Sequence, residues 1–576
     1  MSDHTDALDT GSAYFEPDDQ YPLGGYCCQH SHREQYRVRH LLDFLGVEVS
    51  AARHKPVIHI VPGELHRVVF AAERELADYG QHYQFGGLIA SISTDPTTSD
   101  PAIVPTSLPA LTQVLSVAVT FETFNAKLGE WVRCDPPTRH VSILDNMQTY
   151  RFLPPLAGVV RQPYFRESDG ELIVQAGYDA GSHRFGVFDP RQFPIQEPTL
   201  ENARNALAML EDLLEEFHFV TPTDKAAALC GMFTAVVRPT LNYAPAFHVK
   251  AHVFGSGKSY LCDLIGSFAG PGGNYKVSYP TTAEEATKVI LSLLLTSPAV
   301  IEFDDMSTDW IPHGTINRVL TSDKITDRIL GVSKTATVGT RTLFLGSGNN
   351  VGPVRDLLRR VLTIHLDPRS ATPATLSYRG NPVEKVRKNR GVYVAAVLTI
   401  ILAWRKAGSP RSEIKSIVTY GGSWTDYCRH PLIWLGHPDP ATSLIEQVTH
   451  DPDADILGGL MQEWYKAFAS IPTTVRKAVT SAEGNYPNLR DAICEFPVEE
   501  RGVINRSKLG WILKKNSNRI VGGFEFQPAI ADGRAAWRVV PVASPVAFTP
   551  PPSPPSTGPV AGGGGAVDLG GVDYDF

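Results

Sequence analysis

The stretch that most constrains the fold of this chain covers residues 246–265. It begins with a β-favouring run, Ala246–Ala251, continues into a loop that contains Gly255, Ser256 and Gly257, and ends in an apolar-periodic run that predicts a helix. Glycines allow backbone N–H groups to close around phosphate oxygens, and the N-terminus of the helix adds partial positive charge. We therefore interpret the stretch as a phosphate-binding loop for ATP.

Six residues of this loop are expected to bind the nucleotide: Gly255, Ser256, Gly257, Lys258, Ser259 and Tyr260. Lys258 would reach the β- and γ-phosphates, and the Ser259 hydroxyl would hold Mg²⁺. The full pattern has glycine five residues before Gly257, whereas position 252 is His. Taken alone, the loop is therefore also compatible with an ordinary turn between a strand and a helix.

A second group of candidate residues follows the apolar run at residues 299–303, which ends in Asp304 and Asp305. A buried strand that ends in two carboxylates, about 45 residues after the phosphate loop, is what ATP hydrolysis requires. Asp304 would complete the Mg²⁺ shell through water, and Asp305 or Glu302 would orient the attacking water. The alternative is a strand followed by an acidic turn.

Two further motifs predict groups that act on the γ-phosphate. The apolar run at residues 342–348 leads to Asn349 and Asn350, and an amide at that sheet edge can polarise the phosphate or the water. Arg359 and Arg360 precede the next strand, and arginines there can reach the ATP of a neighbouring subunit, where their charge lowers the barrier. For any one arginine, a surface salt bridge is the commoner role.

The N-terminal part divides into two segments. Residues 1–47 hold four candidate zinc ligands, His4, Cys28, His30 and His32. Tetrahedral zinc sites need four ligands, usually paired across a short loop, and only the last three of these are close together; the alternative is a degenerate ribbon without zinc. Residues 48–198 alternate between strand and helix patterns and predict a mixed α+β domain.

Composition limits the classes of function. No run of about 18 apolar residues occurs and the N-terminus is acidic and polar, so we expect no membrane association and a cytoplasmic location. The seven cysteines are scattered, which favours reduced thiols over a disulfide framework. Because the net charge is −8, any nucleic-acid contact must come from a local basic patch or an inward-facing ring of charge.

Three segments follow the central part of the chain. We expect a helical extension at residues 406–487 and a winged helix at residues 488–540. Lys508 and Lys514, on the amphipathic helix of that winged helix, would face DNA, although many winged helices bind protein instead. Residues 541–576 are Pro- and Gly-rich, acidic and end on Phe, and predict a disordered tail that recruits replication partners or only solubilises the chain.

The order of these motifs resembles that of AAA+ helicases of superfamily 3 and of related replication ATPases of phages, plasmids and integrative elements. The resemblance rests on GSGKS, on EFDDM, on GSGNN, and on RDLLRR followed by a strand. It is nearest to bacterial mobile-element proteins in which a helicase module follows a primase-type zinc ribbon, and it covers about residues 1–540. The chain departs from that pattern at His252, at Asp305, where the second acidic residue varies, and in a ribbon that lacks its first and last cysteines.

The resemblance implies an α/β fold with a P-loop, AAA+-like core at residues 199–405, between the mixed α+β domain and the winged helix. It also implies a β-hairpin at residues 328–338 that projects into a ring channel, with Lys334 at or near its tip. Arg328 and Lys334 would then bind DNA phosphates without reading the sequence. The alternative is an ordinary exposed hairpin.

Together these expectations describe an ATP- and Mg²⁺-dependent DNA helicase that forms a ring, expected to be a hexamer, on single-stranded or forked DNA. Two other classes share the motifs. One is an ATP-gated replication initiator or scaffold that assembles on DNA or on a partner without unwinding, and the other is an ATPase of a mobile-element defence or regulatory system. The motifs report ATP chemistry and do not separate these three functions.

Overall fold

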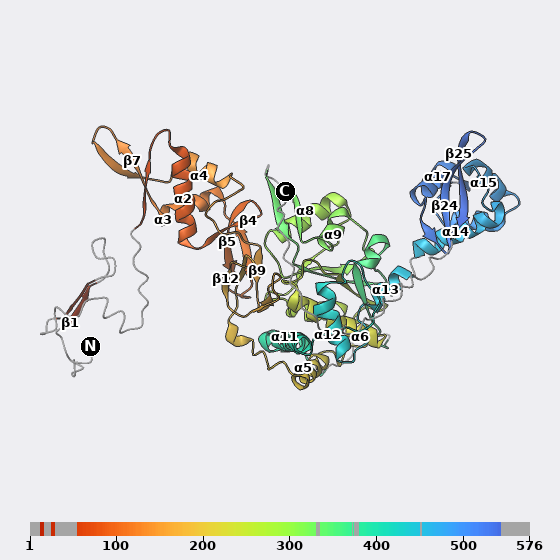
Figure 1. Cartoon of the computed structure of the whole chain (residues 1–576), viewed down its shortest axis with the longest axis horizontal. Coiled ribbons are helices and arrows are strands. Elements are labelled where there is room, and N and C mark those ends of the chain that lie inside the picture. The colour runs from red at the N-terminus through yellow and green to blue at the C-terminus, as the bar shows by residue number, and fades with distance from the viewer. Residues whose placement is uncertain are drawn as a thin grey trace, which may run out of the picture. The chain divides into compact units, whose positions relative to one another are not determined.

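Figure 1 shows the computed structural model of the chain, which describes residues 12–15, 25–28, 55–329, 334–370, 372–373, 379–449, 452–500 and 502–542. The chain forms two compact units, Met1–Asp451 and Pro452–Phe576. Several predictions fall outside the described residues: the zinc ligands His4, His30 and His32, the side chain of Cys28, and the tail from residue 543 onwards.

The first unit begins with short strands and helices in mixed order. Strand β1 (Ser12–Phe15) pairs antiparallel with β2 (Gly25–Cys28), and three sheets follow with strand orders β3-β7-β8, β4-β5-β6 and β12-β13-β9. Their strands are β3 (Val57–Ile60), β4 (His82–Phe85), β5 (Leu88–Thr94), β6 (Pro101–Pro105), β7 (Thr120–Asn125), β8 (Glu130–Cys134), β9 (Gly158–Val160), β12 (Gly177–Asp179) and β13 (Arg184–Gly186). The remaining elements of this part are α2 (Leu65–Tyr79), α3 (Leu108–Ala118), α4 (Thr138–Asp145), β10 (Tyr164–Phe165), β11 (Leu172–Ile173) and η1 (Pro190–Gln192).

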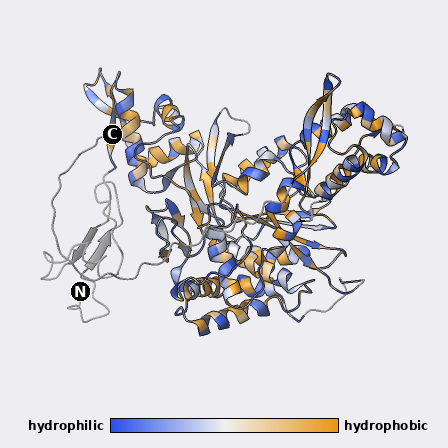
Figure 2. Ribbon diagram, turned by 45° about the vertical axis from the view of Figure 1, so that its right-hand side comes forward, coloured by the Kyte–Doolittle hydropathy of each residue, from blue (hydrophilic) through white to orange (hydrophobic). Residues whose placement is uncertain are grey.

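Helical periodicity determines which side of α2 is buried. Val68, Ala72 and Leu76 recur at four-residue spacing and pack into one hydrophobic cluster with Ile58 of β3 and Phe121 of β7. Burial of each such large side chain contributes about 1.5–3 kcal/mol relative to exposure. Figure 2 shows the resulting alternation of hydrophobic and hydrophilic residues along the helices of the chain.

The rest of the first unit is organised around a five-stranded sheet. Its strands are β14 (Ala246–Ala251), β15 (Tyr275–Val277), β16 (Val300–Met306), β19 (Leu343–Asn349) and β20 (Val361–Leu366). The helices are α5 (Leu200–Asp212), α6 (Pro222–Val237), α7 (Lys258–Ser267), α8 (Ala283–Leu294), α9 (Gly314–Val319), α10 (Pro382–Lys388), α11 (Arg390–Lys406), α12 (His430–Trp434) and α13 (Thr442–Thr449). The other elements are the hairpin strands β17 (Lys324–Arg328) and β18 (Thr335–Gly339), the 3₁₀ turn η2 (Arg355–Arg359) and the π-helical turn η4 (Thr425–Arg429).

All neighbouring strands of the central sheet are parallel, in the order β15-β16-β19-β14-β20. The prediction of an α/β core is thereby confirmed, and the structure shows that its sheet is parallel. Strand β19 lies between the strand before the phosphate loop and the strand with the carboxylates, and Ala251 of β14 pairs with Asn349. The carboxyl ends of all five strands therefore meet at one edge, which is where open α/β sheets bind ligands.

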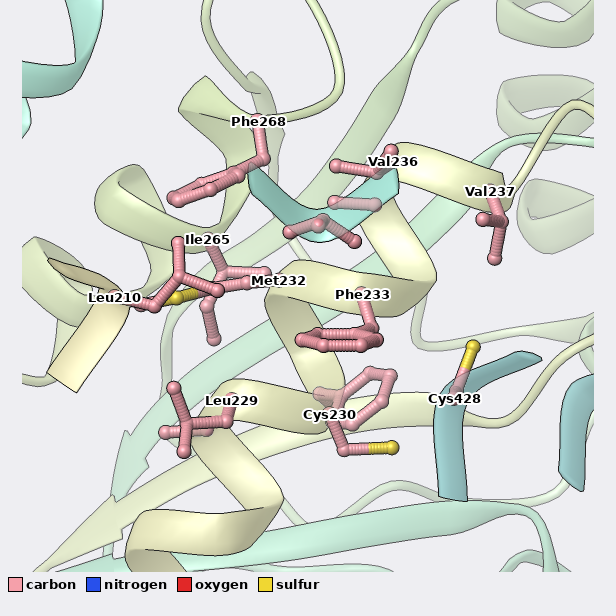
Figure 3. Close-up of a cluster of buried hydrophobic side chains, with 14 of the residues drawn as sticks. Leu210, Leu229, Cys230, Met232, Phe233, Val236, Val237, Ile265, Phe268 and Cys428 are labelled. Atoms are coloured by element: carbon pink, nitrogen blue, oxygen red, sulfur yellow. The ribbon is translucent and has the colours of Figure 1, made fainter. Parts of the chain in front are cut away.

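Helix α6 forms the centre of the hydrophobic core of the first unit. Thr221 and Asp224 form a capping box at its N-terminus, and the residues from Ala226 to Val237 are buried on every side. Figure 3 shows Leu229, Met232, Phe233 and Val236 of this helix among side chains from α5 and α7. A helix that is apolar all round belongs in an interior, and α6 supports α7, which begins at the phosphate loop.

The second unit has its own core. It contains α14 (Pro452–Phe468), α15 (Val475–Glu483), α16 (Pro487–Cys494), β21 (Glu499–Glu500), β22 (Val503–Ile504), α17 (Arg506–Lys515), β23 (Ile520–Val521), β24 (Phe524–Ala531) and β25 (Arg534–Pro541). Trp464 of α14 is fully buried, and its ring lies 5.3 Å from that of Phe526 in β24. The boundary expected at residue 488 is therefore wrong, because α14 and α15, assigned to a helical extension, complete this core.

Candidate nucleotide-binding site

The loop between β14 and α7 allows close approach of an anion. Gly255 and Gly257 have φ angles of 72° and 82°, in the left-handed region that favours glycine. Gly257 precedes α7, and no described side chain caps this helix, so its first N–H groups are available to a ligand. The Ser256 hydroxyl donates to the carbonyl of Val253 and tightens the loop.

Lys258 is the first residue of α7 and is only 9 % exposed. Within the described part of the chain its ammonium group makes no hydrogen bond or salt bridge. Burial lowers the pKa of Lys258, and the negative charge of Asp305 opposes that shift. A half-desolvated cation in this position is stabilised when a phosphate group binds beside it.

Asp304 accepts hydrogen bonds from two hydroxyl groups. Ser259 Oγ donates to Asp304 Oδ1 at 2.8 Å and Ser347 Oγ donates to the same oxygen at 2.9 Å. Burial alone would raise the pKa of Asp304, but the hydrogen bonds from the two serines, together with the charge and hydrogen bond of Lys276, outweigh burial and lower it. An ionised carboxylate beside a serine hydroxyl at the start of a helix is a donor set that suits Mg²⁺.

The sequence suggested that Asp305 follows the strand, but it lies inside β16. The strand register shifts between Phe303 and Met306, and Asp305 has a φ of 47°, so the backbone bulges at this point. The Asp305 N–H group donates to Asp304 Oδ1 at 3.0 Å. The bulge leaves Asp305 exposed beside the buried strand, where water has access to its carboxylate.

The two asparagines at the end of β19 have different environments. Asn349 Oδ1 is buried and has no hydrogen-bond partner among the described residues. Asn350 Oδ1 lies 2.8 Å from His252 Nδ1. The histidine that departs from the usual loop pattern thus joins the phosphate loop to the end of β19.

Lys276, on β15, is a site residue that we did not predict. Its Nζ lies 3.3 Å from Asp304 Oδ2 and 3.2 Å from Asp263 Oδ1. Burial opposes the charge of this lysine, but the carboxylates of Glu302, Asp263 and Asp304 raise the pKa of Lys276. The only sequence signal was a single lysine in a short β-favouring run, which is too common a pattern to indicate a site.

Glu302 belongs to β16, which packs against α7, and it shares Lys276 with Asp304. Its side chain is fully buried, and Oε2 accepts a hydrogen bond of 2.7 Å from Asn274 Nδ2. Burial raises the pKa of Glu302 to about 7, although Asn274 and Lys276 favour the charged form. The suggestion that Glu302 orients the attacking water is therefore not supported by its position, and Asp305 is the exposed carboxylate of the pair.

An apolar pocket of about 320 Å³ opens beside the phosphate loop. Phe217 and Tyr260 line it with their rings 6.0 Å apart and inclined by 25°. The Tyr260 hydroxyl donates to Asn381 Oδ1 across the pocket. Its position next to Gly257 suits the flat base of a nucleotide whose phosphates bind the loop. Phe217 was not predicted, because it lies at the end of a helical pattern far from the loop in sequence.

The two candidate arginines both bind Asp356, which lies in the 3₁₀ turn η2. Arg359 belongs to the same turn, and Arg360 is the residue after it. Arg359 Nη2 lies 2.6 Å from Asp356 Oδ1, and Arg360 Nη1 contacts Asp356 Oδ2. The Arg359 side chain is 55 % exposed, whereas that of Arg360 is 12 % exposed. The Arg359 guanidinium group is therefore accessible from solvent, and Arg360 is mostly buried within the chain.

The hairpin expected to bind DNA is present as β17 and β18, but its tip, residues 330–333, lies outside the described residues. Arg328 ends β17 and is exposed. Lys334 is not the free cation that we expected, because its Nζ lies 2.8 Å from Asp145 Oδ2 in α4 and donates to the Asp145 carbonyl at 3.1 Å. Any contact of Lys334 with DNA requires that this salt bridge open.

Helix α17 of the second unit exposes basic residues. Lys514 is exposed, whereas Lys508 forms a salt bridge of 2.6 Å with Glu500. Trp511 is 62 % exposed, and the Lys515 ammonium lies 5.1 Å from the centre of its ring. An exposed tryptophan beside basic side chains can contact nucleic acid or a protein.

No protein-family model and no curated protein matches this sequence. The solved structures that are similar to the chain include the following three. The SCCmec type IV Cch protein, described as an active helicase, is 12 % identical over 67 % of this chain and 81 % of that one, with a TM-score of 0.30. The NrS-1 C-terminal region in an apo form is 11 % identical over 82 % and 99 %, with a TM-score of 0.33. JCV helicase with a bound thiazolopyridine compound is 14 % identical over 41 % and 73 %, with a TM-score of 0.20.

Similarity at this level carries no argument for activity, which has to come from the site itself. The described helices include none that is both long enough and apolar enough to span a membrane.

Proposed function

We propose that the chain is an ATP- and Mg²⁺-dependent DNA helicase of the superfamily 3 type, which works as a ring. One observation carries the proposal: Lys258, Ser259, Asp304 and Asn349 converge at the carboxyl edge of one parallel sheet. They belong to segments up to about 90 residues apart in sequence. A turn without function would not need a desolvated lysine, an ionised carboxylate and an unpaired amide oxygen at the same place.

The described residues fit ATP and Mg²⁺. Bound ATP would supply the phosphoanhydride bond, and the metal would shield the charge of its phosphates. Lys258 and the N–H groups at the start of α7 would bind the phosphates, and Ser259 and Asp304 would hold the metal, directly and through water. Asn349 Oδ1, which has no partner among the described residues, would accept a hydrogen bond from the attacking water, and Asp305 would orient the same water.

The exposed position of Arg359 supports the proposal of a ring assembly. Its exposed guanidinium group would reach the nucleotide of the adjacent subunit, which makes each site complete only between two chains. We propose a cytoplasmic ring of six subunits that acts on single-stranded or forked DNA during replication of a mobile element or phage. Arg328 and Lys334 of the hairpin and Lys508 and Lys514 of α17 would contact DNA. Zinc at the N-terminus and partner recruitment by the tail stay predictions.

The test compares the wild-type chain with Lys258→Ala in ATP hydrolysis and in unwinding of a forked duplex. Loss of one charge that stabilises the transition state should lower hydrolysis by about 100-fold or more, and unwinding with it. Lys288→Ala, which removes an exposed lysine paired with Glu284 on α8, is the matched control. Wild-type rates in Lys258→Ala would refute the proposal. ATP hydrolysis and DNA binding without strand separation by the wild-type chain would favour the initiator or scaffold instead.

A further inference from the structure

A groove of about 850 Å³ lies between the N-terminal part of the first unit and the hairpin of β17 and β18. Its volume is in the upper part of the range for ligand sites, about 300–1,000 Å³. Arg341, two residues before β19, lies in its floor. Strand β19 is about 20 Å long, so the groove is at the amino edge of the central sheet, opposite to the nucleotide loop.

The walls of the groove approach each other through main-chain atoms. The turn at Gly86 and Gly87 forms one wall, and Thr335 and Thr337 of the hairpin form the other. The Thr337 N–H group donates to the Gly86 carbonyl at 3.4 Å, and a Cβ atom on Gly86 would lie 2.9 Å from the Thr337 carbonyl oxygen. A side chain at position 86 would therefore clash with the hairpin at this contact.

The floor of the groove holds more positive than negative charge. Arg184 and Arg341 share one carboxylate, with Arg184 Nη2 at 2.5 Å from Glu167 Oε1 and Arg341 Nη2 at 2.7 Å from Glu167 Oε2. A smaller cavity of about 40 Å³, also lined by these two arginines, adds Arg238. Among the described residues, the Arg238 guanidinium group donates only to main-chain carbonyls, those of Thr340, Leu241 and Thr342. Two of these three cations therefore share one carboxylate, and Arg238 has no carboxylate partner among the described residues.

The crowding of these cations affects their protonation. Burial, with the charge of Arg184, lowers the pKa of Arg341 to about 10, and burial, with the charge of Arg341, lowers the pKa of Arg238 to about 9. Such shifts mean that the charged forms are poorly compensated in this structure. A bound anion would compensate them.

Lys324 adds an accessible cation at the base of the hairpin. It is exposed, lines the groove, and has no salt bridge within the described residues. Arg166, another cation of the lining, is already neutralised by carboxylates outside the groove, and Asp323 is the second acidic residue of the lining. Of the Phe, Tyr and Trp rings, the lining holds only that of Phe85, which is 3 % exposed, so no such ring is available for bases to stack on.

We propose that this groove binds the phosphodiester backbone of a single nucleic-acid strand, with Lys324 and Arg341 contacting phosphates and Arg184 positioning Arg341 through Glu167. This proposal rests on the proposed function in one respect: it takes the bound strand to be the strand along which the helicase moves. The groove has room for more than one phosphate, Lys324, Thr335 and Thr337 of the hairpin line it, and it presents positive charge without exposed Phe, Tyr or Trp rings, which is the pattern of backbone binding. Arg341 would recognise phosphate as a planar donor, and Lys324 would do so as a point charge.

The first test measures binding of a fluorescent dT₂₀ oligonucleotide by anisotropy, at several salt concentrations and with a non-hydrolysable ATP analogue. Lys324→Glu and Arg341→Gln are compared with Lys415→Glu, which reverses an exposed lysine outside the groove. We expect about tenfold weaker binding in each groove variant, and a salt dependence whose slope falls by about 0.7 for each phosphate that is no longer bound. Thermal melting shows whether each variant is still folded. Binding equal to that of the wild type in both groove variants would overturn the proposal.

The second test asks what occupies the groove. Lys324→Cys is labelled with a photoactivatable aryl azide and irradiated with radiolabelled dT₂₀ or with radiolabelled ATP, and labelled wild-type chain and labelled Lys415→Cys give the background. A covalent adduct with dT₂₀ above that background supports the proposal. An adduct with ATP alone would replace it with a small-nucleotide site, and no adduct with either would refute it. Neither test requires ATP hydrolysis, so failure of the helicase proposal and failure of this one are distinguishable.

Discussion

His252 Nδ1 lies 2.8 Å from Asn350 Oδ1, and this contact joins the phosphate loop to the end of β19. The geometry has the Nδ1–H group of His252 donating to the amide oxygen. The strand that ends in Asn349 and the loop that ends in Lys258 are thereby held together from the exposed side of the site. A residue that breaks the sequence pattern of the loop thus has a structural role in it.

The first prediction concerns this contact. His252→Ala removes one hydrogen bond, worth about 1 kcal/mol, and should lower kcat for ATP hydrolysis about fivefold through misplacement of Asn349. Asn350→Ala should have an effect of the same size. The double variant should lose no more than either single one, because both remove the same interaction. Additive losses measured in steady-state kinetics would show that the two residues act separately.

A second prediction concerns the base pocket. Phe217→Ala removes one of the two rings that line it, and stacking of a base on an aromatic ring is worth about 1–3 kcal/mol. We expect the Kd for ATP to rise about tenfold or more while kcat changes little, because the phosphates keep their contacts. Phe219→Ala, whose ring lies 6.2 Å from that of Phe217 but does not line the pocket, is the control. An unchanged Kd for Phe217→Ala in calorimetric titration would place the base elsewhere.

A third prediction follows from the protonation of Glu302. Its pKa is raised to about 7 in the folded chain, so the unfolded chain loses its proton at lower pH than the folded chain. Between about pH 4.5 and pH 7 the unfolded state therefore binds fewer protons, and the free energy of unfolding falls as pH rises. Above pH 7 this contribution is constant. Each unit of pKa shift corresponds to about 1.4 kcal/mol, so the expected loss is about 2–4 kcal/mol.

Glu302→Gln tests this pH dependence. Glutamine keeps the size of the side chain and stays neutral, so the variant should gain stability over the wild type as pH rises from 5 to 7.5 in denaturant titrations. Glu284→Gln, which changes an exposed glutamate on α8, should follow the wild-type curve in this range. Parallel curves for wild type and Glu302→Gln would mean that Glu302 is ionised in the folded chain throughout.

A fourth prediction concerns sites shared between subunits. Arg359→Ala and Lys258→Ala should each abolish hydrolysis in homogeneous assemblies. A mixture of the two should recover part of the activity, because some boundaries then pair an intact Arg359 with an intact Lys258. Arg387→Ala, which removes an exposed arginine paired with Glu384, is the control and should retain activity. No recovery over a range of mixing ratios would argue that Arg359 acts within its own chain or only as a partner of Asp356.

Local sequence was sufficient for the elements of the nucleotide site. Glycines at positions of positive φ, a lysine and serine at the start of an apolar helix, and an apolar run that ends in carboxylates are short-range patterns. They predicted β14, the loop, α7 and β16, and they placed Lys258, Ser259 and Asp304. Backbone propensity and hydrophobic period act over a few residues, so these features could be predicted without the fold.

Only the tertiary structure decided which distant groups meet. Strand pairing put Lys276 beside Asp304, and packing put Phe217 beside Tyr260. Folding also paired Lys334 with Asp145 and added α14 to the C-terminal core. Charge pairing and burial between remote segments depend on the order of strands and on how layers pack, neither of which leaves a periodic signal in the chain. The sequence by itself thus determined the chemistry at the phosphate loop, and the fold determined its neighbours, the groove at the opposite sheet edge, and which cations are already paired.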